Sequence, residues 1–115
     1  MLNSPKDEMT EDTLPAPLDI DAIHKALANP VRRQILQWLK EPEVHFAEQV
    51  YPLHNGVCAG LIDQRAGLSQ STVSAHLAVL QKAGLVRIKR VGQWSFFRRD
   101  EEAIAAFLAH INAGL

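Results

Sequence analysis

The sequence predicts a mostly helical α+β fold with five helices and a two-stranded β-hairpin, and three observations lead to it. Apolar residues recur at helical spacing in several segments that are bounded by proline, glycine or a capping residue. Residues 85–99 instead alternate apolar and polar side chains on either side of a Gly-Gln turn, which is typical of a hairpin. The length of 115 residues suits one domain with a modest core.

The composition is that of an ordinary globular protein. No apolar run approaches the length of a membrane span, and the start of the chain is polar and acidic. We therefore expect a cytoplasmic protein with no membrane segment. The single cysteine, Cys58, excludes an internal disulfide framework.

The net charge of −1 hides an uneven distribution. Residues 1–24 carry a net charge of −5, whereas residues 25–115 hold eleven basic and seven acidic side chains, a net charge of +4. Residues 82–99 contain six basic side chains and no acidic one. We expect residues 1–17, which include three prolines, to form a flexible acidic arm, and residues 18–115 to form the domain. A basic stretch is also compatible with a solvated strand pair, so charge alone does not define a partner.

Helix boundaries can be placed along the first half of the chain. A first helix begins near Asp19, and a second opens at Asn29-Pro30, where an N-cap precedes a proline at the first helical position. That helix ends before Pro42. Residues 41–57 receive no firm assignment: their aromatic groups cover the core, assist a dimer contact or line a pocket for a small organic ligand.

The segment from residue 58 to residue 83 is the most informative. A short helix from about Cys58 to Arg65 ends at Gly67, and Ser69 then caps a helix over Gln70–Ala83. Its apolar stripe consists of Val73, Leu77 and Leu80. Its other side is rich in hydroxyl and amide groups rather than charges, which suits a surface that approaches another molecule closely.

Two short helices joined by a tight glycine turn and followed by a basic hairpin form the order of a winged helix-turn-helix. Such a helix fits the major groove of B-DNA with its N-terminal side chains against base edges, and Gln70 can pair with adenine. The cations of the hairpin would neutralise phosphates and supply salt-dependent affinity. The candidate DNA-binding residues are Ser69, Gln70, Ser71, Thr72, Ser74, Arg87, Lys89, Arg90, Gln93 and Arg98.

Three segments resemble the ArsR/SmtB-type bacterial repressors: Leu68–Val86 is similar to their recognition helix, Ala26–Leu36 to the opening of their second helix, and Arg90–Arg98 to their wing. The resemblance covers roughly residues 19–113. It implies a homodimer built from the first and last helices, a pseudo-palindromic double-stranded operator, and repression relieved by an inducer. It also implies a DNA-facing role for His76. The alternative for His76 is a hydrogen bond to the backbone or helix turn.

Many members of that family sense metals, but the ligand sets are incomplete in this chain. The family pattern places Cys58 at the first cysteine of a Cys-x-Cys pair and Gly60 at the second. The other family site needs several ligands along the last helix, where Asp100 is followed by Glu101-Glu102 and later only by His110. We therefore expect no metal or other cofactor. A metal-responsive repressor using Cys58 with His54 and His45 stays an alternative.

Cys58 is the candidate sensor residue. It could be a small buried apolar group, a metal ligand, or a thiol at a helix N-terminus, where the helix dipole favours the thiolate that oxidants attack. The inducer itself is not defined by the sequence. We expect His24 and His110 to be polar groups of the dimer-forming helices.

Two other classes of protein compete with the repressor hypothesis. A winged-helix module that binds only proteins would not require the six cations of residues 82–99. An enzyme would require a nucleophile with its base, paired acids, a phosphate loop or a metal set, and none occurs at catalytic spacing. We therefore expect no catalytic activity.

Overall fold

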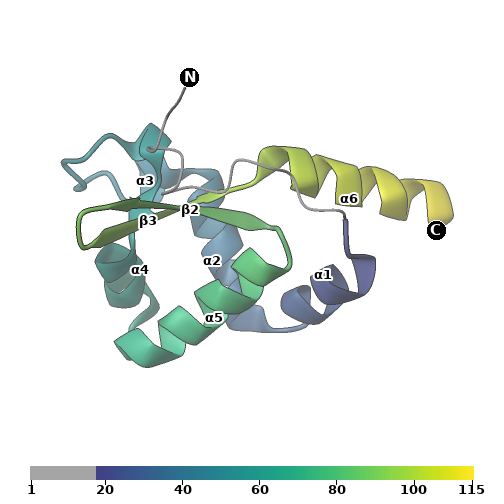
Figure 1. The fold of residues 1–115 in the computed structure, drawn as a ribbon, viewed down its shortest axis with the longest axis horizontal. Coiled ribbons are helices and arrows are strands. Elements are labelled where there is room, and N and C mark those ends of the chain that lie inside the picture. Colours follow the sequence, from purple (N-terminus) through teal and green to yellow (C-terminus); the bar gives the residue numbers. More distant parts are fainter. Residues whose placement is uncertain (1–17) are drawn as a thin grey trace, which may run out of the picture.

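The computed structural model describes residues 18–115 as a layered arrangement of helices around a small antiparallel sheet (Figure 1). The flexible arm expected over residues 1–17 lies outside the described residues. The helices are α1 Ile20–Leu27, α2 Pro30–Lys40, α3 Pro42–His45, α4 Ala59–Ala66, α5 Gln70–Lys82 and α6 Glu101–Gly114, with a 3-10 turn, η2, at Leu53–Asn55. The strands are β1 Val57–Cys58, β2 Val86–Val91 and β3 Trp94–Arg99.

Polar caps start the helices where the sequence predicted. The Asp19 carboxylate accepts a hydrogen bond from the Ala22 amide. Asn29 Oδ1 accepts hydrogen bonds from the amides of Val31 and Arg32, the two residues that follow Pro30. These bonds satisfy amides that have no partner inside the helix. The predicted beginnings of α1 and α2 are confirmed.

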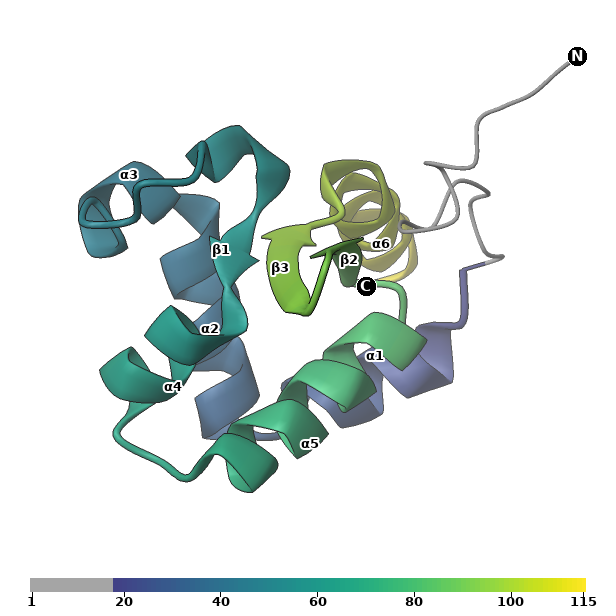
Figure 2. The same ribbon diagram turned by 60° about the vertical axis from the view of Figure 1, so that its left-hand side comes forward.

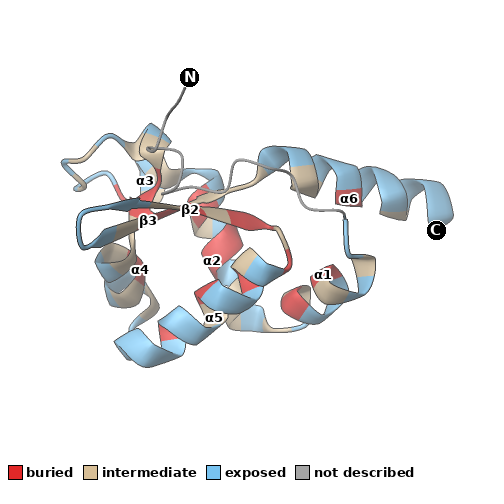
Figure 3. Ribbon diagram, in the orientation of Figure 1, coloured by how far each residue is buried: buried red, intermediate tan, exposed pale blue. Residues whose placement is uncertain are grey.

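The sheet has the order β1-β3-β2, and its register separates two faces. Ile88 pairs with Phe97, and Lys89 pairs with Phe96. Since directly paired residues of antiparallel strands project to the same face, Ile88 and Phe97 share the core face, while Lys89 lies on the outer face. Figure 3 shows the buried positions along the inner sides of α2, α5 and the sheet; among the most buried are Ile23, Ile35, Ile62, Val73, Leu80 and Leu85.

The predicted winged helix-turn-helix fold is confirmed, with two additions inside residues 41–57. The short helix α3 follows α2, and the short strand β1 joins the hairpin as a third strand, Val57 pairing with Phe97 and Cys58 with Phe96. A two-residue strand and a four-residue helix are too short to leave a periodic signal. Phe46, whose side chain is 1% exposed, lies in the core; of the three roles considered for the aromatic groups of residues 41–57, it covers the core.

The Gln49 side chain closes the loop between α3 and β1. Its Nε2 donates to the carbonyl oxygens of Tyr51 and Gly56, each at 2.9 Å. Its Oε1 accepts from the Cys58 amide at 2.8 Å. One side-chain amide thereby satisfies three backbone groups of this loop.

The last helix contacts the first at one side of the molecule. Figures 1 and 2 show α6 leaving the sheet and running past α1, far from the start of α5. The His24 ring of α1 meets the Phe107 ring of α6 edge to face, with centroids 5.4 Å apart. Phe107 is buried, so this pair fixes how the two helices approach each other.

We predict that Gly56→Ala destabilises the fold. Gly56 has a φ of +114°, and an added Cβ would lie 3.0 Å from the Phe97 backbone nitrogen. Strain of this kind lowers the free energy of unfolding by about 1–3 kcal/mol, which denaturant unfolding would measure. Gly60→Ala is the matched control, because that site is open and helical, and alanine there should stabilise by up to about 1 kcal/mol. Equal effects of the two changes would contradict the assignment.

Candidate nucleic-acid interface

The turn between α4 and α5 has the tight geometry that the sequence predicted. Gly67 adopts a φ of +67°, and its amide donates to the Asp63 carbonyl at 3.0 Å, which ends α4. Two residues later Ser69 Oγ accepts from the Thr72 amide at 3.2 Å and starts α5. The Ser69 hydroxyl also donates to Thr72 Oγ1 at 2.8 Å, so its first role is to cap the helix.

The N-terminal half of α5 presents an exposed polar surface without formal charge. Val73 and Leu77 are buried against the core, which turns Gln70, Ser71 and Ser74 toward solvent. No Asp, Glu, Lys or Arg occurs between residues 66 and 81. Free amides and the helix dipole at this end favour an approaching anion, and the exposed hydroxyl and amide groups can bond to base edges.

The candidate DNA-binding residues of the hairpin lie in three different environments. Arg90 and Gln93 are exposed next to the turn at Gly92. Arg87 and Arg98 are paired directly across the strands, on the outer face of the sheet. Lys89 lies on the same face, but its ammonium donates to Asn55 Oδ1 at 3.1 Å, which ties β2 to the loop before β1. Of these cations, Arg90 has the most exposed position beside the turn.

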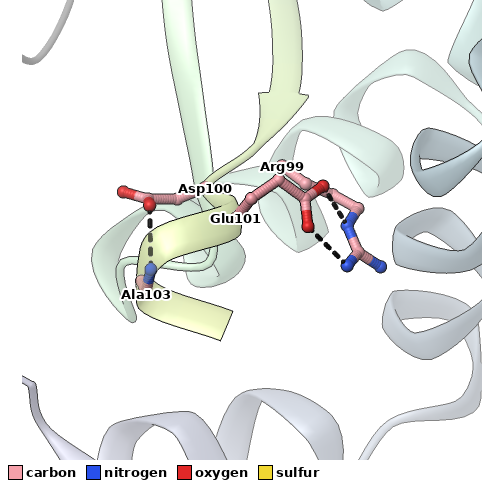
Figure 4. Close-up of polar contacts among 4 residues, drawn as sticks. All are labelled: Arg99, Asp100, Glu101 and Ala103. Carbon is pink, nitrogen blue, oxygen red and sulfur yellow. Dashed lines mark hydrogen bonds and ion pairs between the residues drawn. The ribbon is translucent and has the colours of Figure 1, made fainter. Parts of the chain in front are cut away.

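The sixth cation of the basic stretch, Arg99, is neutralised at the start of α6. Figure 4 shows its guanidinium bonded to both carboxylate oxygens of Glu101, at 2.8 and 2.9 Å, while Asp100 caps the helix by accepting from the Ala103 amide. The hydrogen bond from Arg99 lowers the pKa of Glu101, so the pair persists until the pH falls well into the acidic range. Arg99 therefore serves the β3–α6 junction.

The structure brings the start of α5 and the hairpin turn to one side of the molecule. Both lie on the left in Figure 1, away from the free end of α6, and both come forward in Figure 2. Strand β1 joins the two parts, since Cys58 is the N-cap residue of α4 and also pairs with Phe96 of β3. Helix-turn-helix and hairpin are thus held as one unit.

His76 lies at the border of this surface. It is half-buried on α5, and its Nδ1 lies 3.2 Å from Nη1 of Arg32 on α2. The family resemblance predicts a DNA contact for His76, with a hydrogen bond to the backbone or helix turn as the alternative. The structure adds a third partner, a side chain 44 residues away.

Cys58 is a free, half-buried thiol residue next to an aromatic pair. Its strand partner Phe96 stacks on Tyr51, with ring centroids 4.2 Å apart. Among residues 18–115, no three His, Cys, Asp or Glu side chains gather closely enough to hold a metal ion. His45, one of the ligands considered, instead accepts a hydrogen bond from Arg65 at its Nδ1, at 3.0 Å.

The α1–α6 side of the molecule leaves apolar groups partly uncovered. Leu108 of α6 is 58% exposed. Four further apolar residues there are only half-buried: Ile20, Leu27, Ile104 and Ile111. His24 and His110 are exposed on the same two helices.

Three residues that hold the structure together are not predicted by the sequence pattern: Arg32, Gln49 and Asn55. Each holds a distant segment through a side-chain hydrogen bond, and such contacts have no periodic signature. The arginine pair directly after a helix break was the one available signal, because cations favour the C-terminal end of a preceding helix.

Within residues 18–115, no helix is both long and apolar enough to cross a membrane.

Comparison with known proteins gives concordant matches. Residues 58–87 match the model of the bacterial regulatory proteins of the arsR family. The HTH-type transcriptional regulator YbzH of Bacillus subtilis is 46% identical over 84 residues, which span 71% of this chain and 84% of YbzH. The transcriptional activator HlyU of Vibrio cholerae is 33% identical over 84 residues, spanning 73% of this chain and 66% of HlyU.

A solved structure is similar over most of the chain. The homodimeric winged helix-turn-helix DNA-binding domain of Mb0332 from Mycobacterium bovis, described as a possible ArsR-family transcriptional regulator, superposes with a TM-score of 0.59 at 28% identity. The match covers 82% of this chain and 77% of that domain.

Proposed function

The chain belongs to the ArsR family and is a DNA-binding transcriptional regulator rather than an enzyme; from this premise we propose that it is a homodimeric repressor of a pseudo-palindromic operator. The observation that carries the proposal is the uncharged, hydroxyl- and amide-rich start of α5, which lies on the same side of the molecule as the hairpin turn with its exposed Arg90. A regulator that binds bacterial DNA would act in the cytoplasm.

In the proposed complex, α5 enters the major groove and the hairpin lies along the adjoining backbone or minor groove. Gln70, Ser71 and Ser74 would meet base edges or phosphates, and Arg90 with Gln93 would reach the backbone from the turn. Ser69 and Thr72 stabilise the N-terminus of α5 through their hydrogen bonds with each other. Arg87, Lys89 and Arg98 would strengthen the attraction from the outer face of the sheet, and His76 completes the proposed contact set.

Dimerisation through α1 and α6 is supported by their uncovered apolar residues and by the homodimeric state of the Mb0332 domain. A two-fold dimer would present two copies of α5 to half-sites about 10 base pairs apart or multiples of that spacing. Homodimers commonly bury such apolar surface.

Repression requires only that the dimer occupies its site and obstructs transcription. HlyU bears the name of an activator, so the sign of regulation needs its own experiment. Deleting the coding sequence and measuring transcripts of the genes next to a bound site decides it: a rise indicates repression, and a fall overturns the repressor proposal.

Release by an inducer through modification of Cys58 is the proposed regulatory step, with metal binding as the alternative. Cys58 connects β1 to α4, so a larger group on its sulfur would disturb the junction between hairpin and helix-turn-helix. Hydrogen peroxide, as the oxidant, would convert the thiolate to a sulfenic acid: the sulfur attacks one peroxide oxygen, the O–O bond breaks, and hydroxide leaves. In Cys58→Ser, peroxide should no longer release the DNA; a variant that is still released contradicts this step.

We predict that Gln70→Ala relaxes sequence preference. Loss of a bidentate base contact lowers the affinity for a preferred duplex by about 1–3 kcal/mol relative to random DNA. Fluorescence anisotropy with a labelled duplex selected by the wild-type protein from a random library, and with a scrambled duplex of the same composition, measures both affinities. An equal loss on the two duplexes would contradict base reading by Gln70.

We predict that Arg90→Ala weakens binding to both duplexes alike and reduces the salt slope by about one. Lys89→Ala is the matched control, because its ammonium already bonds to Asn55. Its effect on the salt slope should be smaller. Titrations at several salt concentrations measure the slopes, and a wild-type slope near zero would remove the DNA proposal itself.

We predict that Leu108→Glu yields monomers that lose operator affinity, because the charge enters the proposed apolar dimer contact. A charge at Ile111 should act in the same way. Leu108 is a cleaner site than Phe107, whose burial would couple dimerisation to folding. Light scattering measures the mass, with Val50→Glu as control at a 97% exposed apolar residue elsewhere. An active dimer of Leu108→Glu would refute the placement.

A further inference from the structure

Arg32 joins three helices through one guanidinium group. Its Nε donates to the Ala26 carbonyl at 2.7 Å, and its Nη2 donates to the Lys25 carbonyl at 3.2 Å, both at the C-terminal end of α1. Its Nη1 reaches Nδ1 of His76 on α5 at 3.2 Å. The two backbone acceptors hold the planar fork in place, so the third nitrogen has a defined direction toward α5.

The chemistry of this contact selects one tautomer of the neutral histidine ring. A guanidinium has donors only and keeps its proton throughout the biological pH range. Nδ1 of His76 therefore acts as the acceptor, and the neutral ring carries its hydrogen on Nε2. Within residues 18–115 that Nε2–H group has no hydrogen-bond partner, although His76 is half-buried at the edge of the recognition surface.

We infer that Arg32 is a positioning residue that presents His76 to DNA as an Nε2–H donor. This inference rests on the proposed DNA-binding function and assigns His76 one hydrogen bond to an acceptor of the duplex, a phosphate oxygen or a base edge. Arg32 itself stays behind the helix and touches the carbonyls of α1. The contact also connects α1, the proposed dimer helix, to the ring that meets the DNA.

Two substitutions at His76 distinguish the role of Nε2 from the role of Nδ1. His76→Gln can place an amide N–H near the position of Nε2, and His76→Asn can place a carbonyl oxygen near the position of Nδ1. The donor hypothesis therefore expects His76→Gln to bind the selected duplex within about threefold of wild type. His76→Asn and His76→Ala should bind about tenfold more weakly, the equivalent of one hydrogen bond to a charged acceptor.

A matched pair of arginines tests the positioning role. Arg32→Gln removes the contact with His76, whereas Arg33→Gln removes only the bond from Arg33 Nη1 to the Leu27 carbonyl at 2.7 Å. Both variants lose capping of α1, and denaturant unfolding should show the larger loss of stability in Arg32→Gln, which loses two carbonyl bonds where Arg33→Gln loses one. Only Arg32→Gln should weaken DNA binding, by about tenfold.

The tautomer of His76 can be measured without DNA. Long-range ¹H–¹⁵N spectra of the free full-length protein distinguish the two neutral tautomers of each histidine. In wild type and in Arg33→Gln, the His76 signals should report hydrogen on Nε2, and in Arg32→Gln they should shift toward exchange between tautomers. This measurement holds even where a variant binds DNA poorly for another reason.

The outcomes separate this inference from the broader proposal. If wild type binds neither the selected nor the scrambled duplex, the DNA-binding function itself fails and the inference fails with it. If wild type binds but His76→Asn binds equally well, or His76→Gln is no better than His76→Ala, the donor role is overturned. A loss on both duplexes assigns the acceptor to a phosphate, and a loss on the selected duplex alone assigns it to a base.

Discussion

The burial of Val73, Leu77 and Leu80 is the constraint on which the rest of the structure depends. These three side chains fix the rotation of α5 about its own axis, because a turn of the helix by one residue would carry apolar groups into water. That rotation decides that Gln70, Ser71 and Ser74 face outward. The proposed interface is therefore a consequence of core packing, and its side chains need no contact with one another to be correctly presented.

The same constraint explains why so much was predictable from the sequence. Helical spacing, Asn29-Pro30, Ser69 and Gly67 are local signals, and each is read from neighbours in the chain. They defined the fold and the position of α5 without knowledge of distant contacts. The hairpin was equally visible, because strand alternation and a Gly-Gln turn are also local.

What the sequence could not define depends on contacts between distant residues. Strand β1 exists because Val57 and Cys58 find β3 about forty residues later, and a two-residue strand has no pattern of its own. The basic stretch gave the number of cations but not their roles: Arg99 pairs with Glu101, and Lys89 holds Asn55. A count of charges treats these residues alike. The structure instead separates Arg90, which is exposed and a candidate for phosphate binding, from Lys89 and Arg99, which bond to side chains of the same protein.

Strand β1 has a mechanical consequence for recognition. Because it belongs at once to the sheet and to the start of α4, the hairpin and the helix-turn-helix cannot adjust their separation independently. This shared strand leaves the adjustment to the nucleic acid: the duplex must offer its grooves at the separation that β1 sets, or bend to provide it. Since the free energy of such bending depends on base sequence, base pairs that no side chain touches would still influence which sites are occupied.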